Sequence, residues 1–332
     1  MDELKKRLAG SSLSSEREPV DGFEAGRRRG SERPPQEGGG SRPSDLGSRT
    51  GYAADFLGPN HSVPLPGLGT VLAVKAVEVN RRAGGIDRFV LPYTHYSVVM
   101  NGERRMPFFS AVNIDGTQLR RIPRGDNWFL DPRIPTDFQT GDEVYKNNDL
   151  DKGHMTRRLD PVWGSSDVAS RADADTFCFT NACPQHKDLN QKEWQQLEDY
   201  VLSNTGAHEL RVCVFTGPIM RPGDRPYRGI LLPEEFWKVV VIVRDDTREL
   251  SATGYVLSQR DMITGFEFVF GTFKTYQVVI RKIAEVTGLD FGRLPDFDPK
   301  ARVRQRPRAG GGFEAAPEPE ATEIRGPADL VF

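Results

Sequence analysis

Two neighbouring stretches, Tyr96-Ser97-Val98-Val99-Met100 and Pro107-Phe108-Phe109-Ser110-Ala111-Val112-Asn113-Ile114, predict the centre of a sheet. The first is followed by Asn101-Gly102, and Asn-Gly between apolar runs is a strong hairpin signal. Further core strands are predicted from apolar runs at 176–180, 211–215, 237–243 and 255–257. Many strands, few helices and no regular βαβ alternation predict an α+β fold with a mainly antiparallel central sheet.

Three other segments complete the expected elements. Residues 70–80 (TVLAVKAVEVN) are expected to form a strand. Residues 190–204 predict a helix, because Trp194, Leu197 and Val201 recur at helical spacing on one face. Residues 273–287 predict a final helix that Gly288 ends in the C-cap position.

Composition divides the chain into three parts. Residues 1–65 are rich in Gly, Ser, Arg, Glu and Pro and carry almost no apolar pattern, so they are expected to form a disordered N-terminal arm. The folded domain is expected over 66–299. Residues 300–332 return to Arg, Gly, Pro, Ala and Glu and are expected to form a disordered C-terminal tail.

Hydropathy, cysteine content and net charge give only broad limits on the compartment and on the class of partner. No stretch approaches the ~20 apolar residues that a membrane span needs, so no membrane partner is expected. No apolar run follows the charges of the N-terminus, which indicates a cytoplasmic protein or one exported by a non-classical route. Cys178, Cys183 and Cys213 are odd in number and lack metal spacing, so they are expected to pack as small hydrophobes. The net charge of −2 does not exclude a polyanion partner, because local patches steer nucleic acid.

The tetrapeptide Asp151-Lys152-Gly153-His154 offers the first candidate for catalysis. An imidazole with a pKa of ~6.5 can accept a proton near neutrality. Asn190 and Glu198 lie two turns apart on the expected helix and could line one side of it. An amide oxygen is a plausible Mg²⁺ ligand, yet Asn190 could equally cap the helix, with Glu193 completing a capping box.

Basic residues occur in local clusters, which are often no more than solvated faces. Arg157 and Arg158, which follow His154 closely, are the best candidates for phosphate contacts. Guanidinium groups match the geometry of phosphate oxygens.

Together these blocks resemble the DNA/RNA non-specific endonucleases of the ββα-metal finger class, which include endonuclease G. The family's Asp-Arg-Gly-His appears as Asp151-Lys152-Gly153-His154. Other matching blocks are Thr180-Asn181-Ala182-Cys183-Pro184-Gln185, Leu189-Asn190, 194–198, Phe215-Thr216-Gly217-Pro218 and 233–240. The resemblance covers roughly residues 70–296 and implies a ββα-metal finger active site.

The resemblance implies a role for each matching residue. His154 would activate water as general base, and Asn181 would shape the site around it. Asn190 would be the only direct protein ligand of one Mg²⁺ (or Mn²⁺), while Glu198 would hold metal-bound water. The reaction would be hydrolysis of DNA and RNA to 5′-phosphate products. An inhibitor protein and a homodimer are further partners that the resemblance leaves open.

Two departures from the family pattern keep an alternative open. Lys152 replaces the arginine of the tetrapeptide; it would serve as a substrate contact, although it lacks the bidentate fork. The arginine that some members carry after the glutamate is Leu202, and an upstream arginine would fall near Asp126, where Arg124 or Arg133 could substitute. The alternative function is therefore a catalytically weak, nuclease-like protein that binds nucleic acid or partners.

Overall fold

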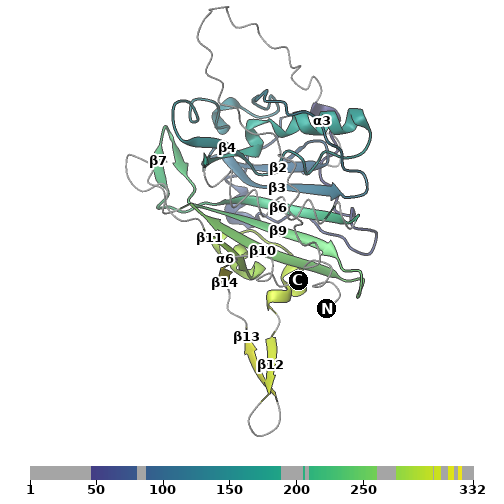
Figure 1. Ribbon diagram of the computed structural model, residues 1–332. Helices are drawn as coiled ribbons and strands as arrows, with labels where there is room; N and C mark the ends of the chain where they lie inside the picture. The colour runs from purple at the N-terminus through teal and green to yellow at the C-terminus, as the bar shows by residue number, and fades with distance from the viewer. Residues whose placement is uncertain are drawn as a thin grey trace, which may run out of the picture.

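The computed structural model describes residues 46–80, 87–187, 205, 209–259, 274–301, 303–307, 313–317 and 321–323. Its centre is an eight-stranded sheet in the order β1-β2-β3-β6-β9-β10-β11-β14 (Figure 1). The strands are β1 (Val90–Pro92), β2 (Tyr96–Asn101), β3 (Met106–Asp115), β6 (Arg211–Ile219), β9 (Glu235–Val243), β10 (Leu250–Ser258), β11 (Lys274–Val278) and β14 (Ala321–Glu323). Every neighbouring pair in this sheet is antiparallel, which confirms the predicted α+β fold.

The hairpin β2–β3 is confirmed, but its turn is longer than two residues. The register pairs Asn101 with Met106, and Arg105 adopts the positive φ of 59°. The Asn101 side chain caps the turn, because its Oδ1 accepts hydrogen bonds from the backbone of Glu103 (3.0 Å) and Arg104 (3.2 Å). Asn therefore serves here through its side chain, as it does in Asx turns.

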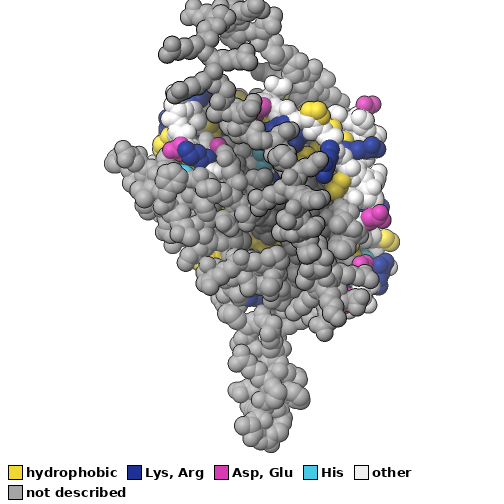
Figure 2. Space-filling model, viewed as in Figure 1, with side chains coloured by type: hydrophobic (Ala, Val, Ile, Leu, Met, Phe, Trp, Pro, Cys, Tyr) yellow, Lys and Arg dark blue, Asp and Glu magenta, His cyan; other side chains and the backbone are white. Residues whose placement is uncertain are grey.

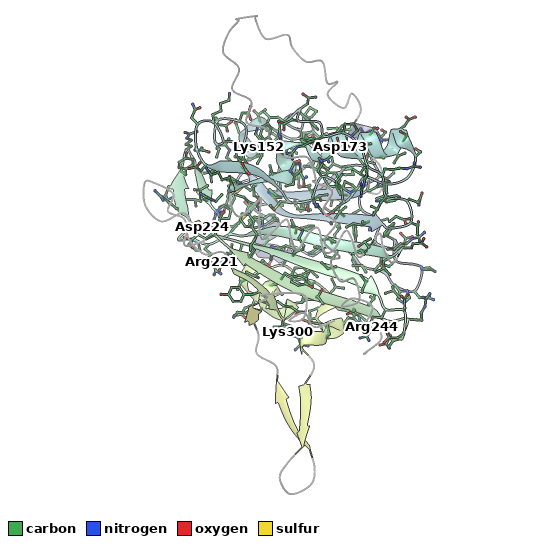
Figure 3. The ribbon with its side chains drawn as sticks, viewed as in Figure 1. Lys152, Asp173, Arg221, Asp224, Arg244 and Lys300 are labelled. Atoms are coloured by element: carbon green, nitrogen blue, oxygen red, sulfur yellow. The ribbon has the colours of Figure 1, made fainter. Side chains whose placement is uncertain are left out.

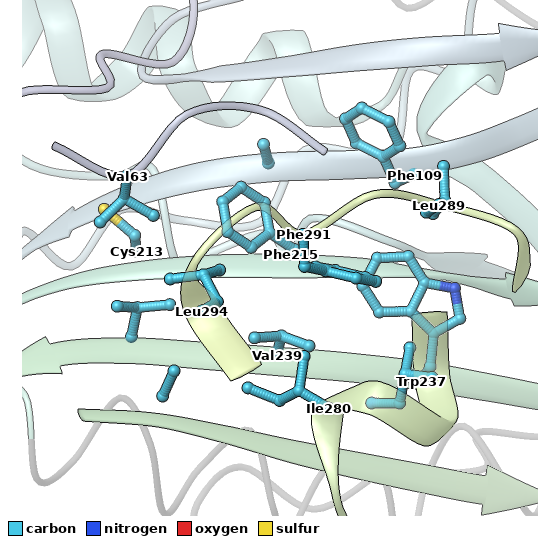
Figure 4. Packing of buried hydrophobic residues seen from close by; sticks show 14 of the residues in the cluster. Val63, Phe109, Cys213, Phe215, Trp237, Val239, Ile280, Leu289, Phe291 and Leu294 are labelled. Carbon is cyan, nitrogen blue, oxygen red and sulfur yellow. The ribbon is translucent and has the colours of Figure 1, made fainter. Parts of the chain in front are cut away.

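Both faces of the sheet are buried, which explains why the strands are apolar along their whole length. Along β6, Cys213 and Phe215 face one core while Val212 and Val214 face another. The first core lies under residues 52–65 and 280–297, and there the rings of Trp237 and Phe291 meet edge to face at 5.3 Å (Figure 4). Such alternation places successive side chains on opposite sides of each strand.

The other face carries two smaller cores beneath the remaining elements. These elements include the antiparallel pair of β4 (Leu150–His154) and β5 (Ala182–His186), the helix α3 (Ser166–Thr176), the 3₁₀ turn η3 (Phe179–Asn181) and the hairpin of β7 (Arg225–Tyr227) and β8 (Ile230–Leu232). In Figure 1, β4 and α3 lie beside the β2–β3 half of the sheet, whereas α6 (Ile280–Thr287) lies beside β10 and β11.

Three expected elements differ from those observed. Residues 70–80 begin as the short helix α2 (Gly69–Ala73) and form no regular strand after it. Ala76 makes an isolated bridge with Asn101, and the backbone N–H groups of Val77 and Val79 donate to the carbonyls of Met100 and Arg88. Residues 176–180 are buried as predicted, but they end α3 and begin η3, and Cys178 makes an isolated parallel bridge with Phe129. The final helix starts at Ile280, since 274–278 pair with β10 as β11; its end at Gly288, with φ 72°, is confirmed. The helix expected at 190–204 lies outside the described residues.

The folded part begins earlier than the expected boundary at residue 66. Residues 46–65 pack on the sheet, with Val63 fully buried. Arg49 reaches Asp175 of α3, with Nε 2.8 Å from Oδ2, and both side chains are buried. The bounds of the remaining 3₁₀ turns are η1 (Leu46–Ser48), η2 (Thr136–Phe138), η5 (Leu294–Phe297) and η6 (Pro299–Ala301). Composition alone placed residues 46–65 in the arm, although their apolar residues pack on the sheet.

The boundary at residue 300 is also corrected. Lys300 is buried, and β14 adds to the sheet by pairing with β11. Between them, β12 (Val303–Pro307) and β13 (Phe313–Pro317) form a hairpin that projects from the body (Figure 1). These strands are paired through backbone hydrogen bonds, which every residue type can form. A prediction based on apolar residues therefore did not find them.

Two sequence predictions, on the cysteines and on membrane spans, can be compared with the described residues. Cys178, Cys183 and Cys213 are free thiols buried in the core, and burial raises the pKa of each above its usual value. They therefore pack as small hydrophobes, as predicted. Among the described residues, no helix is long and apolar enough to cross a membrane.

Candidate active site

His154 lies at the end of a two-stranded platform. Strand β4 pairs with β5 so that His154 is opposite Ala182 and Gly153 is opposite Cys183. A Cβ atom at Gly153 would lie 2.1 Å from Oε1 of Gln185, a side chain that is fully buried. Glycine therefore leaves room for the Gln185 side chain against the backbone of β4.

The His154 imidazole stands among aromatic rings. Its centroid is 4.9 Å from that of Trp128 and 5.4 Å from that of Phe177, which meets it edge on. Phe177 comes from the C-cap of α3. Trp128 is held nearby because its neighbour Phe129 exchanges backbone hydrogen bonds with Phe177 (3.1 Å) and Phe179 (2.9 Å).

The protonation of His154 follows from this enclosure. Its Nε2 is buried and forms no hydrogen bond with any described residue, although the side chain as a whole is half-buried. Burial, together with the positive charges of Arg124 and Arg158, lowers the pKa of His154 to about 3. The imidazole is therefore neutral at pH 7 and has a nitrogen available for a proton.

Asn181 supports the residues that follow the histidine. Its side-chain Oδ1 accepts a hydrogen bond from the Thr156 backbone at 2.8 Å, and its Nδ2 donates to the carbonyls of Thr156 (2.9 Å) and Thr176 (3.1 Å). Its own carbonyl accepts from Met155 at 2.8 Å. Asn181 thus joins the end of β4 to the end of α3, but it lies behind His154 and is fully buried.

The arginines near His154 differ in how they are held. Arg158 Nη1 lies 2.7 Å from Oδ1 of Asp173 in α3, so its guanidinium is partly engaged. Burial raises the pKa of Asp173, while Arg158 opposes that shift. Arg124 is exposed, and Arg157 is half-buried on the turn after β4. Of these arginines, Arg124 and Arg158 act on the imidazole with their positive charge.

Lys152 faces the same side of β4 as His154 and lies at the same end of the molecule as Asp173 (Figure 3). Its Nζ is 2.8 Å from Oδ1 of Asp142. On the face shown in Figure 2, lysine and arginine side chains occur along the upper part of the described surface, with acidic side chains among them. Arg124 and Arg158 place positive charge near the histidine, although the net charge of the chain is −2.

The candidates for metal binding, Asn190 and Glu198, lie outside the described residues. Leu202, which replaces a family arginine, lies outside them too. Within the described ranges, no group of three or more His, Cys, Asp and Glu side chains could hold a metal ion. The donor chemistry of one amide oxygen and one carboxylate suits Mg²⁺, which prefers oxygen ligands and retains several waters.

Three residues of this site were missed in the sequence. Trp128 and Asp142 come from separate loops and Phe177 from the end of α3, and nothing in their spacing relates them to His154. The only available signal was the tryptophan in Gly125-Asp126-Asn127-Trp128, an aromatic residue in a polar loop.

Comparison with known proteins agrees with this arrangement. The family model described as DNA/RNA non-specific endonuclease matches residues 75–297. An uncharacterized protein, y4fB, of Sinorhizobium fredii is 42% identical over 262 residues, which cover 73% of this chain and 39% of that protein. The mitochondrial nuclease EXOG of Homo sapiens is 25% identical over 232 residues, which cover 64% of this chain and 58% of EXOG. The chain thus spans less than two thirds of either relative.

A solved structure of an EndoG/EndoGI complex, described as showing the mechanism of EndoG inhibition, aligns with a TM-score of 0.48 and 21% identity. The alignment covers 63% of this chain and 86% of that chain.

Proposed function

Because the chain belongs to the DNA/RNA non-specific endonuclease family, we propose that it is a metal-dependent endonuclease that hydrolyses phosphodiester bonds of both DNA and RNA. The products would carry 5′-phosphates. The observation that carries the proposal is the neutral His154, whose Nε2 has no hydrogen-bond partner among the described residues and lies close to arginines.

His154 accepts the proton of the attacking water in this proposal. A positioned base of this kind contributes ~10²–10⁴-fold to a rate. Arg124 and Arg157 attract the phosphate, and Arg158, held by Asp173, adds to the same positive field. Asn181 fixes the backbone after the histidine and makes no contact with substrate.

A divalent cation, Mg²⁺ or Mn²⁺, would be held by the Asn190 amide oxygen, with Glu198 holding its waters. When bound, such a cation stabilises negative charge on the phosphate and on the leaving oxygen. Nucleic acid is the expected partner. The proposed partners also include an inhibitor protein and a second copy of the chain. The proposed location is the cytoplasm or, after non-classical export, the outside of the cell.

Digestion of supercoiled DNA and of single-stranded RNA tests the function. We expect cleavage of both with Mg²⁺ or Mn²⁺ and none with chelator. His154→Ala should lose nearly all cleavage and keep DNA binding. His61→Ala is the matched control, because the ring of this histidine forms an exposed hydrogen bond with the Arg248 carbonyl at 2.8 Å. Equal cleavage by wild type and His154→Ala would overturn the proposal.

One observation favours a second candidate function. Lys152 stands where the family has arginine, and its ammonium is already paired with Asp142. Charge stabilisation in the transition state could be too weak for efficient cleavage. Binding of DNA without any metal-dependent cleavage by the wild type would favour this nucleic-acid-binding role.

A further inference from the structure

The Lys152 ammonium occupies a cage. It lies 5.5 Å from the ring centroid of Trp128, 5.9 Å from that of Tyr145 and 5.6 Å from that of Phe179. Asp142 completes the cage at 2.8 Å. The side chain is 26% exposed. Aromatic faces and a carboxylate both attract a cation, so these four groups together hold the ammonium in one place.

The cage connects Lys152 to His154 through one ring. The Trp128 ring lies near both groups, with its centroid 5.5 Å from the ammonium and 4.9 Å from the centroid of the imidazole. Its Nε1 donates to Oδ1 of Asp126 at 3.1 Å, and its ring also meets Phe179 at 5.4 Å. The orientation of Trp128 therefore depends on Lys152, and the surroundings of the histidine depend on Trp128.

The loop that supplies Asp142 and Tyr145 is itself fixed. Arg228, in the turn between β7 and β8, donates from Nη1 to the carbonyls of Glu143 (3.1 Å) and Lys146 (2.5 Å). Arg105 donates from Nη2 to the carbonyl of Gln139 at 2.8 Å. The cage is thus anchored to two hairpins of the fold, and it is not a chance contact of a surface lysine.

We propose that Lys152 is a positioning residue, which holds Trp128 against His154 and makes no contact with the phosphate. This proposal rests on the proposed nuclease function of His154. It replaces the substrate contact that the family resemblance implies for the residue at this position. A phosphate would have to displace Asp142 and three ring faces from the ammonium, whereas the exposed Arg124 has no such competition among its described contacts.

The first test separates positioning from phosphate binding. Lys152→Met keeps the length of the side chain and removes its charge. We expect kcat to fall by roughly 10- to 100-fold, because small displacements of catalytic groups have effects of this size. KM should stay within about twofold, and the slope of log K against log salt for DNA binding in chelator should not change. Arg124→Met is the matched comparison, and it should lower that slope by about 0.9.

A second variant checks that the cage acts as a unit. Asp142→Asn changes a half-exposed side chain that the proposal places away from the nucleic acid. It should lower kcat in the same direction, and the double variant with Lys152→Met should be no slower than Lys152→Met alone. Additive losses, or a salt slope that falls by about 0.9 in Lys152→Met, would overturn the positioning role. If Lys152→Met does not fold, Asp142→Asn carries the same comparison.

A third measurement does not depend on activity. The ring hydrogens of His154, assigned by comparison with His154→Ala, should show an NMR shift caused by the adjacent Trp128 ring. Trp128→Leu should abolish this shift, and Lys152→Met should reduce it. An unchanged His154 signal in Lys152→Met would refute the proposal even if the wild type cleaved nucleic acid. Conversely, a changed signal with an inactive wild type would contradict only the proposed function.

Discussion

The side chain of Asn181 forms two hydrogen bonds with the backbone of Thr156, accepting from its N–H at 2.8 Å and donating to its carbonyl at 2.9 Å. This pair closes the end of β4 immediately after the residues that carry His154. The direction of the imidazole therefore depends on an amide in the segment that joins α3 to β5.

We expect Asn181→Ala to lower both stability and rate. The substitution leaves the buried N–H and carbonyl of Thr156 without partners, which costs about 3 kcal/mol. Urea unfolding measures the free energy of unfolding, and kcat is measured at a temperature where both proteins are folded. Full kcat in a destabilised variant would show that Asn181 has no influence on the histidine.

The pH profile should reflect the low pKa of His154. A base that is neutral down to about pH 3 gives an acid limb of kcat/KM well below the usual histidine value of ~6.5. Arg124→Met removes a positive charge, so protonation becomes easier and the limb should move to higher pH. Arg88→Met, which changes an exposed arginine paired with Glu78, is the control and should not move it. An acid limb at ~6.5 in the wild type would contradict the buried neutral imidazole.

We expect Gly153→Ala to damage the platform and a second change to repair it. The new Cβ would collide with Oε1 (2.1 Å) and Cγ (2.5 Å) of Gln185, which is buried and has little room to move. Overpacking of this kind costs about 1–3 kcal/mol and should displace His154. Gln185→Ala removes the colliding atoms, so the double variant should recover stability and activity relative to Gly153→Ala. No recovery would mean that the backbone of Gly153, and not the collision, is the critical feature.

The Arg49–Asp175 pair should contribute far more than a surface pair. Arg49→Ala leaves a fully buried carboxylate whose other hydrogen bonds among the described residues come from the backbone and hydroxyl of Thr94, and we expect a loss of about 3–5 kcal/mol. Lys75→Ala breaks an exposed pair with Glu103 and should cost under about 1 kcal/mol. Thermal unfolding of both variants measures the difference. Similar effects would show that residues 46–65 are not anchored by this ion pair.

Local pattern was sufficient where burial and strand pairing coincide. The strands 211–215, 237–243 and 255–257 were predicted because the central sheet is covered on both faces, which requires nearly continuous apolar runs. The local sequence pattern failed to predict the structure where strand pairing depends on residues that are distant in the chain. Residues 70–80 have strand-like composition, yet their first half is helical and leaves Val71 72% exposed.

The sequence by itself determined the family, the antiparallel sheet and the histidine at the strand end, because these depend on short-range patterns and on blocks of residues in a set order. Only the tertiary structure decided what surrounds that histidine. Trp128, Asp142 and Phe177 come from loops and a helix end that are far apart in the chain, and they meet because the fold packs them against β4. The pKa of His154 and the cage around Lys152 arise from burial and from nearby charges, which are properties of packing and cannot be read from residue order.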